Sequence, residues 1–203
     1  MPLEALHLTP DDARLVPWKN GRGVTRELAL WPEDAREDWA WRLSRALVDA
    51  AGPFSAFPGC ERVLTVTSGP GLVLAHGAAA PRARLRPLEP YRFSGEWATT
   101  AELVGGPVED FNVITRVGRA RAEVEVLRLG ARRARAALGA GQAYAHVLGA
   151  GLEARVTGEE EAFALGADDS LWVRGARGGE ELDLVGRGAA CVVLLVRLED
   201  ERA

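Results

Sequence analysis

Three polar side chains of uncommon type mark where this chain could bind or transform a small molecule. Its single lysine is Lys19 and its two asparagines are Asn20 and Asn112, and all three lie in two short segments, residues 17–28 and 109–116. An ammonium group donates hydrogen bonds and carries charge, whereas a carboxamide both donates and accepts. Because this combination suits a small polar or anionic ligand, we look for function in these two segments.

The first segment joins a glycine-rich loop to the start of a strand. Its glycines permit positive backbone φ, and Trp18 supplies a rigid apolar wall. In the strand that follows, Thr25 and Glu27 share one face and Arg26 lies on the other. The same pattern fits an Asn-Gly turn that enters a surface strand with solvated Arg26 and Glu27, so the spacing leaves both interpretations open.

The second segment predicts a strand with one apolar and one polar face. Phe111 and Val113 lie on the apolar face, whereas Asp110, Asn112 and Arg116 lie on the opposite one. The polar face suits the lumen of a barrel or the solvent side of a sheet equally well.

Further polar residues between the two segments could complete a binding site. Arg42 and Ser44 share a face of one expected strand, and Arg62 opens the next. Arginines clamp carboxylates through charge-assisted hydrogen bonds, and Glu27 and Asp110 would neutralise and orient some of them. The expected ligand-binding residues are Trp18, Lys19, Asn20, Arg26, Glu27, Arg42, Ser44, Arg62, Asp110, Asn112 and Arg116.

Histidines and cysteines give no pattern for a metal site or a nucleophile. His7, His76 and His146 stand singly in different expected elements, and Cys60 and Cys191 belong to no C-x-x-C pair. No Ser-His or Cys-His arrangement has a recognisable spacing. We therefore expect no metal and no cofactor.

Short β-strands are expected to position these residues, because glycine and proline punctuate the chain and no long amphipathic helix is evident. One short helix is expected near the start, where Thr9 can cap a turn that opens at Pro10 and carries Asp11 and Asp12. The expected strands are residues 25–31, 40–47, 62–67, 71–75, 90–93, 101–104, 108–116, 122–129, 143–148, 152–156, 170–173, 182–185 and 189–198.

The two halves of the chain echo each other. Residues 62–74 and 145–156 both read as strand, glycine turn and strand, and each continues through a leucine-acidic turn into an aromatic strand. This scheme resembles the cupin jelly roll, so the expected fold is an all-β bicupin of two jelly-roll barrels with one short N-terminal helix. An N-terminal lobe, residues 1–118, would carry the pocket, and a C-terminal lobe, residues 119–203, would be mainly structural.

Composition narrows the classes of partner. The 203 residues are 47% hydrophobic with a net charge of −4, which disfavours nucleic acid as a partner. The longest apolar run, residues 189–196, is too short to span a bilayer, and no secretory signal pattern precedes the first strand. We expect a cytoplasmic protein without membrane partners, and a homodimer is compatible with this composition.

A family resemblance adds to these inferences. It is carried by Trp18-Lys-Asn-Gly, Gly23-Val-Thr-Arg-Glu27, Trp41-Arg-Leu-Ser44, residues 52–62 and Asp110-Phe-Asn-Val-Ile-Thr-Arg116. These motifs are similar to those of the HutD/Ves family. The resemblance implies a metal-free bicupin associated with bacterial histidine utilisation, thought to regulate by sensing an intermediate such as N-formylglutamate or urocanate. Arg22 departs from the family pattern, in which glycine is common, so ligand preference can differ here.

Three functional hypotheses follow. The first is a metal-free regulatory or sensor protein that binds a small anionic metabolite. The second is a metal-independent isomerase, lyase or hydrolase of a carboxylated substrate, with Glu27 or Asp110 as general base and Lys19 as general acid or electrostatic stabiliser. A salt-bridged carboxylate usually has a depressed pKa, which disfavours this enzyme hypothesis. The third is a structural protein whose rare residues hold loops.

Overall fold

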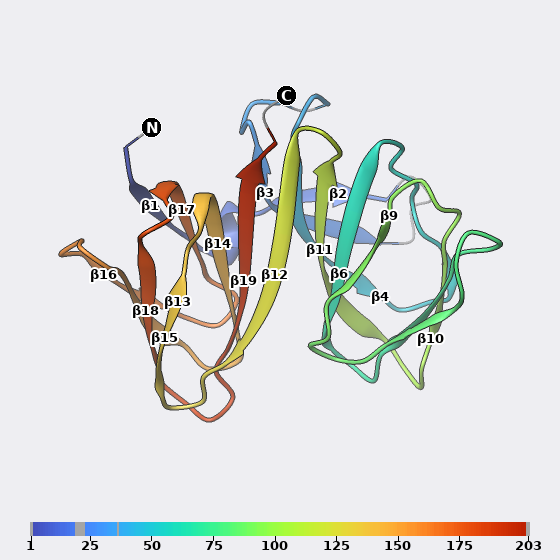
Figure 1. Cartoon of the computed structure of the whole chain (residues 1–203). Helices are drawn as coiled ribbons and strands as arrows, with labels where there is room; N and C mark the ends of the chain where they lie inside the picture. Colours follow the sequence, from blue (N-terminus) through green and yellow to red (C-terminus); the bar gives the residue numbers. More distant parts are fainter. Residues whose placement is uncertain (1, 19–22, 36, 202–203) are drawn as a thin grey trace. The chain divides into compact units, whose positions relative to one another are not determined.

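A computed structural model describes residues 2–18, 23–35 and 37–201 of the chain, and in this part strands and turns dominate (Figure 1). The chain divides into two compact units. We call residues 13–120 the first unit, and residues 2–12 together with 121–201 the second unit. Among the described residues, the structure holds no helix long and apolar enough to cross a bilayer.

The first unit is a sandwich of two antiparallel sheets. The six-stranded sheet has the order β2 (Arg14–Pro17), β3 (Val24–Trp31), β4 (Trp41–Val48), β11 (Val108–Arg116), β6 (Cys60–Ser68) and β9 (Tyr91–Ser94). The four-stranded sheet has the order β5 (Gly52–Pro53), β10 (Thr100–Leu103), β7 (Leu72–Ala75) and β8 (Ala83–Leu85). Leu64 and Val66 of the first sheet share a buried apolar core with Leu72 and Leu74 of the second. This core fixes which face of the six-stranded sheet points inward.

The second unit repeats this plan. Its five-stranded sheet has the order β1 (Glu4–Leu8), β17 (Ser170–Arg177), β14 (Ala140–Leu148), β19 (Val192–Asp200) and β12 (Ala120–Arg128). Its four-stranded sheet has the order β13 (Arg133–Ala137), β18 (Glu181–Gly186), β15 (Leu152–Val156) and β16 (Ala162–Leu165).

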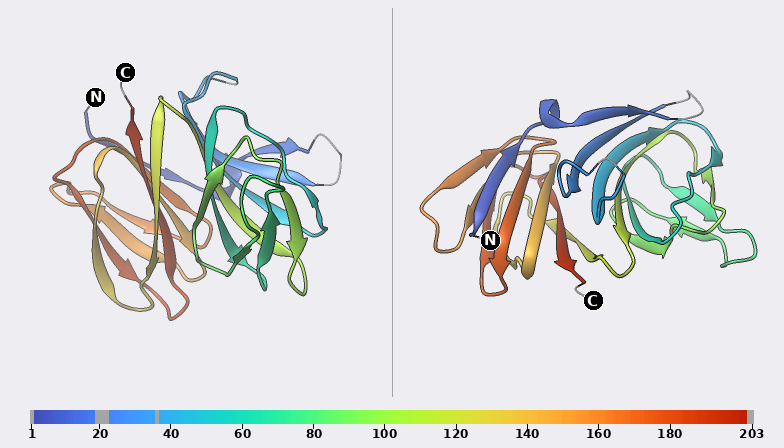
Figure 2. Two further views of the ribbon diagram at one scale, coloured as in Figure 1. Left: turned by 45° about the vertical axis from the view of Figure 1, so that its right-hand side comes forward. Right: turned by 90° about the horizontal axis from the view of Figure 1, so that it is seen from above.

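Strand order makes the internal repeat explicit. The run β4-β11-β6-β9 corresponds to β12-β19-β14-β17, and β5-β10-β7-β8 corresponds to β13-β18-β15-β16. Figure 2 shows the curved sheets of each unit from two further directions. The expected all-β fold of two jelly-roll barrels is confirmed. Within residues 2–12 and 121–201 of the second unit, no strands correspond to β2 and β3, which extend the first unit's sheet beside β4.

The N-terminal segment differs from expectation. Residues Pro10–Asp12 form a single 3₁₀ turn, so the expected helix is not observed as an α-helix. Asp12 Oδ2 accepts hydrogen bonds from Thr9 N at 2.7 Å and from Thr9 Oγ1 at 2.8 Å, which closes the turn. A longer helix has no room, because β1 ends at Leu8 and β2 begins at Arg14.

The strand β1 places the first residues in the second unit, where β1 pairs with β17 from Glu4 opposite Arg174 to Leu8 opposite Ser170. The expected division into residues 1–118 and 119–203 assigns β1 to the N-terminal lobe, whereas β1 pairs with a strand of the second unit. The pairing joins residues more than 160 positions apart, and local sequence pattern carries no record of such a partner.

Candidate functional site

Cross-strand register places Asp110 and Asn112 on the inner face of the first unit. Asn112 lies opposite Ser44 of β4 and Leu64 of β6, and Asp110 lies opposite Ala46 and Val66. Residues directly opposite each other in a sheet point to the same face. Because Leu64 and Val66 belong to the inner core, the side chains of Asp110, Asn112 and Ser44 also point inward.

The strand β3 brings Glu27 to the same face. Glu27 lies opposite Ser44, and a register shift between Glu27 and Ala29 lets its carboxylate meet Arg42. Glu27 Oε2 lies 2.6 Å from Arg42 Nε, and Glu27 Oε1 lies 2.8 Å from Arg14 Nη2. Glu27 is itself buried, and its carboxylate bridges the largely buried Arg42 to Arg14 on the edge strand β2, whose side chain is 49% exposed.

Arg42 retains hydrogen-bonding capacity that the described residues do not use. Its side chain is 15% exposed, and burial lowers its pKa while Glu27 opposes that shift. Among the described residues, the structure gives its two Nη groups no hydrogen-bond partner. A guanidinium in this position can receive a ligand carboxylate from the solvent-accessible side.

Arg62 is enclosed instead. It is 4% exposed, and its guanidinium carbon lies 5.3, 5.4 and 5.0 Å from the ring centres of Phe54, Phe57 and Phe93. Nη1 donates to the Ser55 carbonyl oxygen at 3.2 Å, and Nε donates to Asn112 Oδ1 at 3.4 Å. Burial lowers the pKa of Arg62 to about 10, although the Asp110 charge favours the protonated form.

Asp110 has an unusual titration. Burial raises the pKa of its carboxyl group to about 7, and this effect outweighs the opposing charge of Arg62 and the hydrogen bond from the Ala46 backbone. The expectation that a carboxylate near an arginine has a depressed pKa is therefore wrong for Asp110. The physical reason is that loss of hydration disfavours the ionised form more than one buried cation stabilises it.

Trp18 borders this inner face, as expected of an apolar wall. Its indole Nε1 donates to Thr25 Oγ1 at 2.9 Å, and its ring packs against the core cluster of the unit. A Cβ atom at Gly23 would lie 3.0 Å from the ring, so glycine at this position leaves room for the indole.

Two expected site residues lie elsewhere, and two are outside the described residues. Arg26 is exposed on the opposite face of β3. Arg116 donates from Nε to the Trp39 carbonyl at 2.8 Å and from Nη2 to the Glu37 carbonyl at 2.6 Å, which anchors the loop before β4. Lys19 and Asn20 fall in the part of the chain that the structure does not describe.

The sequence pattern did not point to Arg14 or to the aromatic rings around Arg62. Arg14 lies on β2, and no strand was expected there. A basic residue three strands away from Asn112 becomes a candidate only when β2 is known to pair with β3. His76 is also part of an aromatic cluster in this unit: it hydrogen-bonds Thr99 Oγ1 at 2.9 Å and Tyr91 Oη at 3.2 Å, and burial lowers its pKa.

The second unit carries aliphatic residues at the corresponding inner positions. Leu195 lies opposite Ala145, and Val193 lies opposite Val147, as Asn112 and Asp110 lie opposite Leu64 and Val66 in the first unit. All four of these second-unit residues belong to its apolar core. The polar inner face is therefore a property of the first unit.

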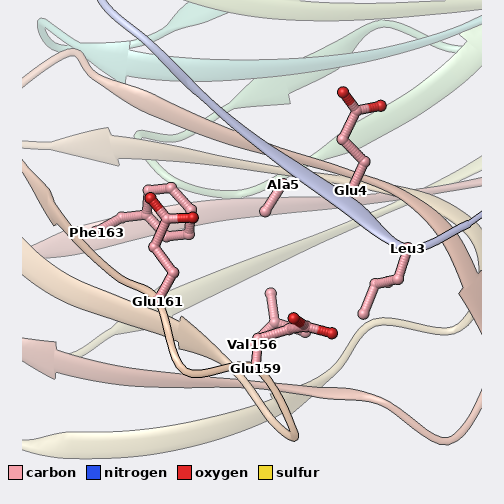
Figure 3. A pocket seen from close by; sticks show the side chains of 7 residues that line it. All are labelled: Leu3, Glu4, Ala5, Val156, Glu159, Glu161 and Phe163. Atoms are coloured by element: carbon pink, nitrogen blue, oxygen red, sulfur yellow. The ribbon is translucent and has the colours of Figure 1, made fainter.

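A separate cavity of about 250 Å³ lies in the second unit, beside the β1 strand (Figure 3). It is lined by Leu3, Glu4, Ala5, Val156, Glu159, Glu161 and Phe163. In Figure 3 the Glu4 carboxylate points away from Leu3, and Glu4 pairs with Arg174. The three glutamates that line the cavity do not suit an anionic ligand. None of the expected ligand-binding residues lines it. Within the described ranges, no group of three or more histidine, cysteine, aspartate or glutamate side chains could hold a metal ion.

Comparison with known proteins identifies the family. A family model described as HutD matches residues 11–192. A Pseudomonas putida protein, described as an uncharacterised 21.2 kDa protein in the hutC 3′ region, is 31% identical over 194 residues, covering 93% of this chain and 96% of that protein.

Solved structures agree with this match. A conserved protein of unknown function from Pseudomonas aeruginosa is 31% identical with a TM-score of 0.87, covering 97% of this chain and 99% of that one. HutD from Pseudomonas fluorescens, in a formate condition, is 31% identical with a TM-score of 0.77 over the same shares. Oxalate decarboxylase from Lactobacillus farciminis, 7% identical with a TM-score of 0.65, shares the fold alone, over 97% of this chain and 86% of that one. The chain belongs to the HutD family.

Proposed function

We propose that this protein binds a small carboxylated metabolite on the inner face of the first unit, without a metal, and acts as a regulatory or sensor protein of histidine utilisation. The observation that carries the proposal is an excess of hydrogen-bond donors and positive charge there. Three guanidinium groups, those of Arg14, Arg42 and Arg62, are balanced by two carboxyl groups: Glu27 pairs with Arg14 and Arg42, and Asp110 favours the charged form of Arg62.

The charge balance favours an anion. With a pKa of about 7, Asp110 is about half protonated at neutral pH, so the cations outnumber the ionised carboxylates. An incoming carboxylate would meet the Nη groups of Arg42, and Ser44 and Asn112 lie next to it on the same face. Charge-assisted contacts of this kind are among the stronger hydrogen bonds in proteins.

Family membership supports the link to histidine utilisation in the proposal. The Pseudomonas putida relative is described by its place in the hutC 3′ region, which points to histidine utilisation for that protein. Intermediates of that pathway, such as N-formylglutamate and urocanate, carry the carboxylates that an arginine-rich face suits.

Calorimetric titration with N-formylglutamate, urocanate, glutamate and histidine tests the proposal. We expect saturable binding of at least one of these acids. Arg42→Gln should weaken it about tenfold to a hundredfold, because a hydrogen bond to a charged group is lost. Arg26→Gln is the matched control, since Arg26 is an arginine on the opposite face of the neighbouring strand. Absence of heat from every acid, or an equal loss in both variants, would contradict the proposal.

An enzymatic role is the second candidate, and one observation favours it. A carboxyl group with a pKa of about 7, as found for Asp110, is matched to general-base chemistry near neutral pH. EDTA-treated protein should then turn over one member of the same metabolite panel, and Asp110→Asn should abolish that turnover. Glu27, held between Arg14 and Arg42, serves in this scheme as an orienting group.

A further inference from the structure

The Asn112 side chain faces a group that can only donate hydrogen bonds. Arg62 Nε donates to Asn112 Oδ1 over 3.4 Å. A guanidinium has five N–H donors and no acceptor, so a carboxamide beside it must present its oxygen, because an amino group there would oppose donor against donor. The Nδ2 amino group of Asn112 therefore points away from Arg62.

Arg62 is poorly placed to bind a ligand itself. Its guanidinium lies among the rings of Phe54, Phe57 and Phe93. In addition to Nε, its Nη1 group is engaged, because it donates a hydrogen bond to the Ser55 carbonyl oxygen. With 4% of the residue exposed, a solvent-borne carboxylate has little access to it. The interactions that enclose Arg62 also fix where its Nε lies.

The geometry of the strands gives the amino group of Asn112 a direction. Asn112 lies between Leu64 on β6 and Ser44 on β4, and Arg62 approaches from the side of β6. The amino group then lies on the side of β4, the strand that also carries Arg42. Asn112 is half-buried although it belongs to an inner strand of the sheet, so solvent reaches this side chain.

We propose that Asn112 selects for a ligand with an oxygen acceptor, a carboxylate or carbonyl group, and that Arg62 is a positioning residue that holds the Asn112 carboxamide in the donating orientation. This inference rests on the proposed function. An ammonium group would meet donors from both Asn112 and Arg42 and is rejected. Arg62 was expected to bind the ligand directly, and here it instead supports the side chain of Asn112.

The orientation of the carboxamide can be tested without any ligand. The chain has three carboxamide side chains, Asn20, Asn112 and Gln142, so a ¹⁵N-labelled sample gives three pairs of side-chain amino signals, and Asn112→Asp identifies one pair. We expect nuclear Overhauser effects between the Asn112 amino protons and the Ser44 β-protons. Effects to the Arg62 ε-proton in place of Ser44 would overturn the proposal.

A double-mutant cycle tests the indirect role of Arg62, with N-formylglutamate as the calorimetric probe. Arg62→Met should weaken binding at least about threefold in the wild-type background and leave it unchanged in the Asn112→Ala background. Asn112→Asp, which exchanges the amino group for an oxygen, should weaken binding about tenfold or more. Arg62→Lys keeps a cation beside Asp110 and replaces the methionine variant if that variant does not fold.

The outcomes separate the two proposals. Equal losses from Arg62→Met in both backgrounds would show that Arg62 contacts the ligand directly, which overturns the positioning role. No binding by the wild-type protein to any carboxylate would overturn the proposed function and the selective role of Asn112 together. The orientation of the Asn112 carboxamide would still be decided by the ligand-free spectra.

Discussion

At the scale of single residues, burial determines the pKa values and the accessibility of the polar side chains on the inner face. Strict alternation along residues 108–116 correctly placed Asp110 and Asn112 on one side, because a strand has a period of two. Alternation could not show that Asp110 is buried or that Arg62 lies among three phenyl rings. It also grouped Arg116 with them, although at the end of β11 this side chain binds the carbonyls of a loop. These differences arise from tertiary contacts, which the spacing of residues does not record.

Asp110 makes a prediction about stability and pH. Its pKa is about 7 in the folded protein against 3.8 for an unperturbed aspartate, so its proton stabilises the fold, and that stabilisation is lost as pH rises from about 4 through 7. Asp110→Asn, which mimics the protonated form, should therefore be more stable than the wild type at pH 8, by at most about 4 kcal/mol. The gap should shrink toward pH 5.

Thermal unfolding followed by circular dichroism between pH 5 and 9 measures this difference. A variant that is less stable than the wild type at pH 8 would mean that the Asp110 charge stabilises Arg62 more than its burial costs.

At the scale of the elements, glycine turns made the central strand pairs of each unit predictable. The successions β6–β7 and β14–β15 were recognised because a strand, a glycine turn and a second strand follow each other directly, although the two strands of each succession belong to different sheets. The strands β1, β2, β5, β8, β13 and β16 were missed. Each lies at the edge of its sheet and has two to five residues, and propensity over so few residues is a weak signal.

One glycine of these turns should be intolerant of substitution. A Cβ atom at Gly149 would lie 2.3 Å from the Ala190 carbonyl oxygen, and its φ is +75°. Gly149→Ala should destabilise the protein by about 2 kcal/mol or more, because the backbone strain is joined by a steric clash. Gly158, with φ of +92° and nothing within 4 Å, is the control for strain alone and should cost about 1 kcal/mol. Chemical denaturation of both variants compares them, and equal losses would remove the clash as a cause.

At the scale of the whole molecule, the two units share one fold but differ in the residues on the inner face, which are polar in the first unit and aliphatic at the corresponding positions of the second. The first unit has Asp110 and Asn112 where the second has Val193 and Leu195, and the strands β2 and β3 add Arg14 and Glu27 to the first unit alone. The two-barrel plan was recoverable from the sequence because the strand and turn scheme recurs, and the clustering of rare residues pointed to the polar face of the first half. The exchange of β1 into the second unit was not recoverable, since it depends on a partner strand at the far end of the chain.

The central claim is that a carboxylate binds beside Asn112 in the first unit, and a ¹⁵N titration of side-chain amino signals tests it most directly. Gln142, buried in the second unit with its Oε1 accepting from Trp172 Nε1 at 2.9 Å, provides an internal reference. On addition of N-formylglutamate or urocanate, the Asn112 signals should shift and saturate while those of Gln142 stay in place. Asn112 signals that remain unmoved at millimolar concentrations of both acids would contradict the account.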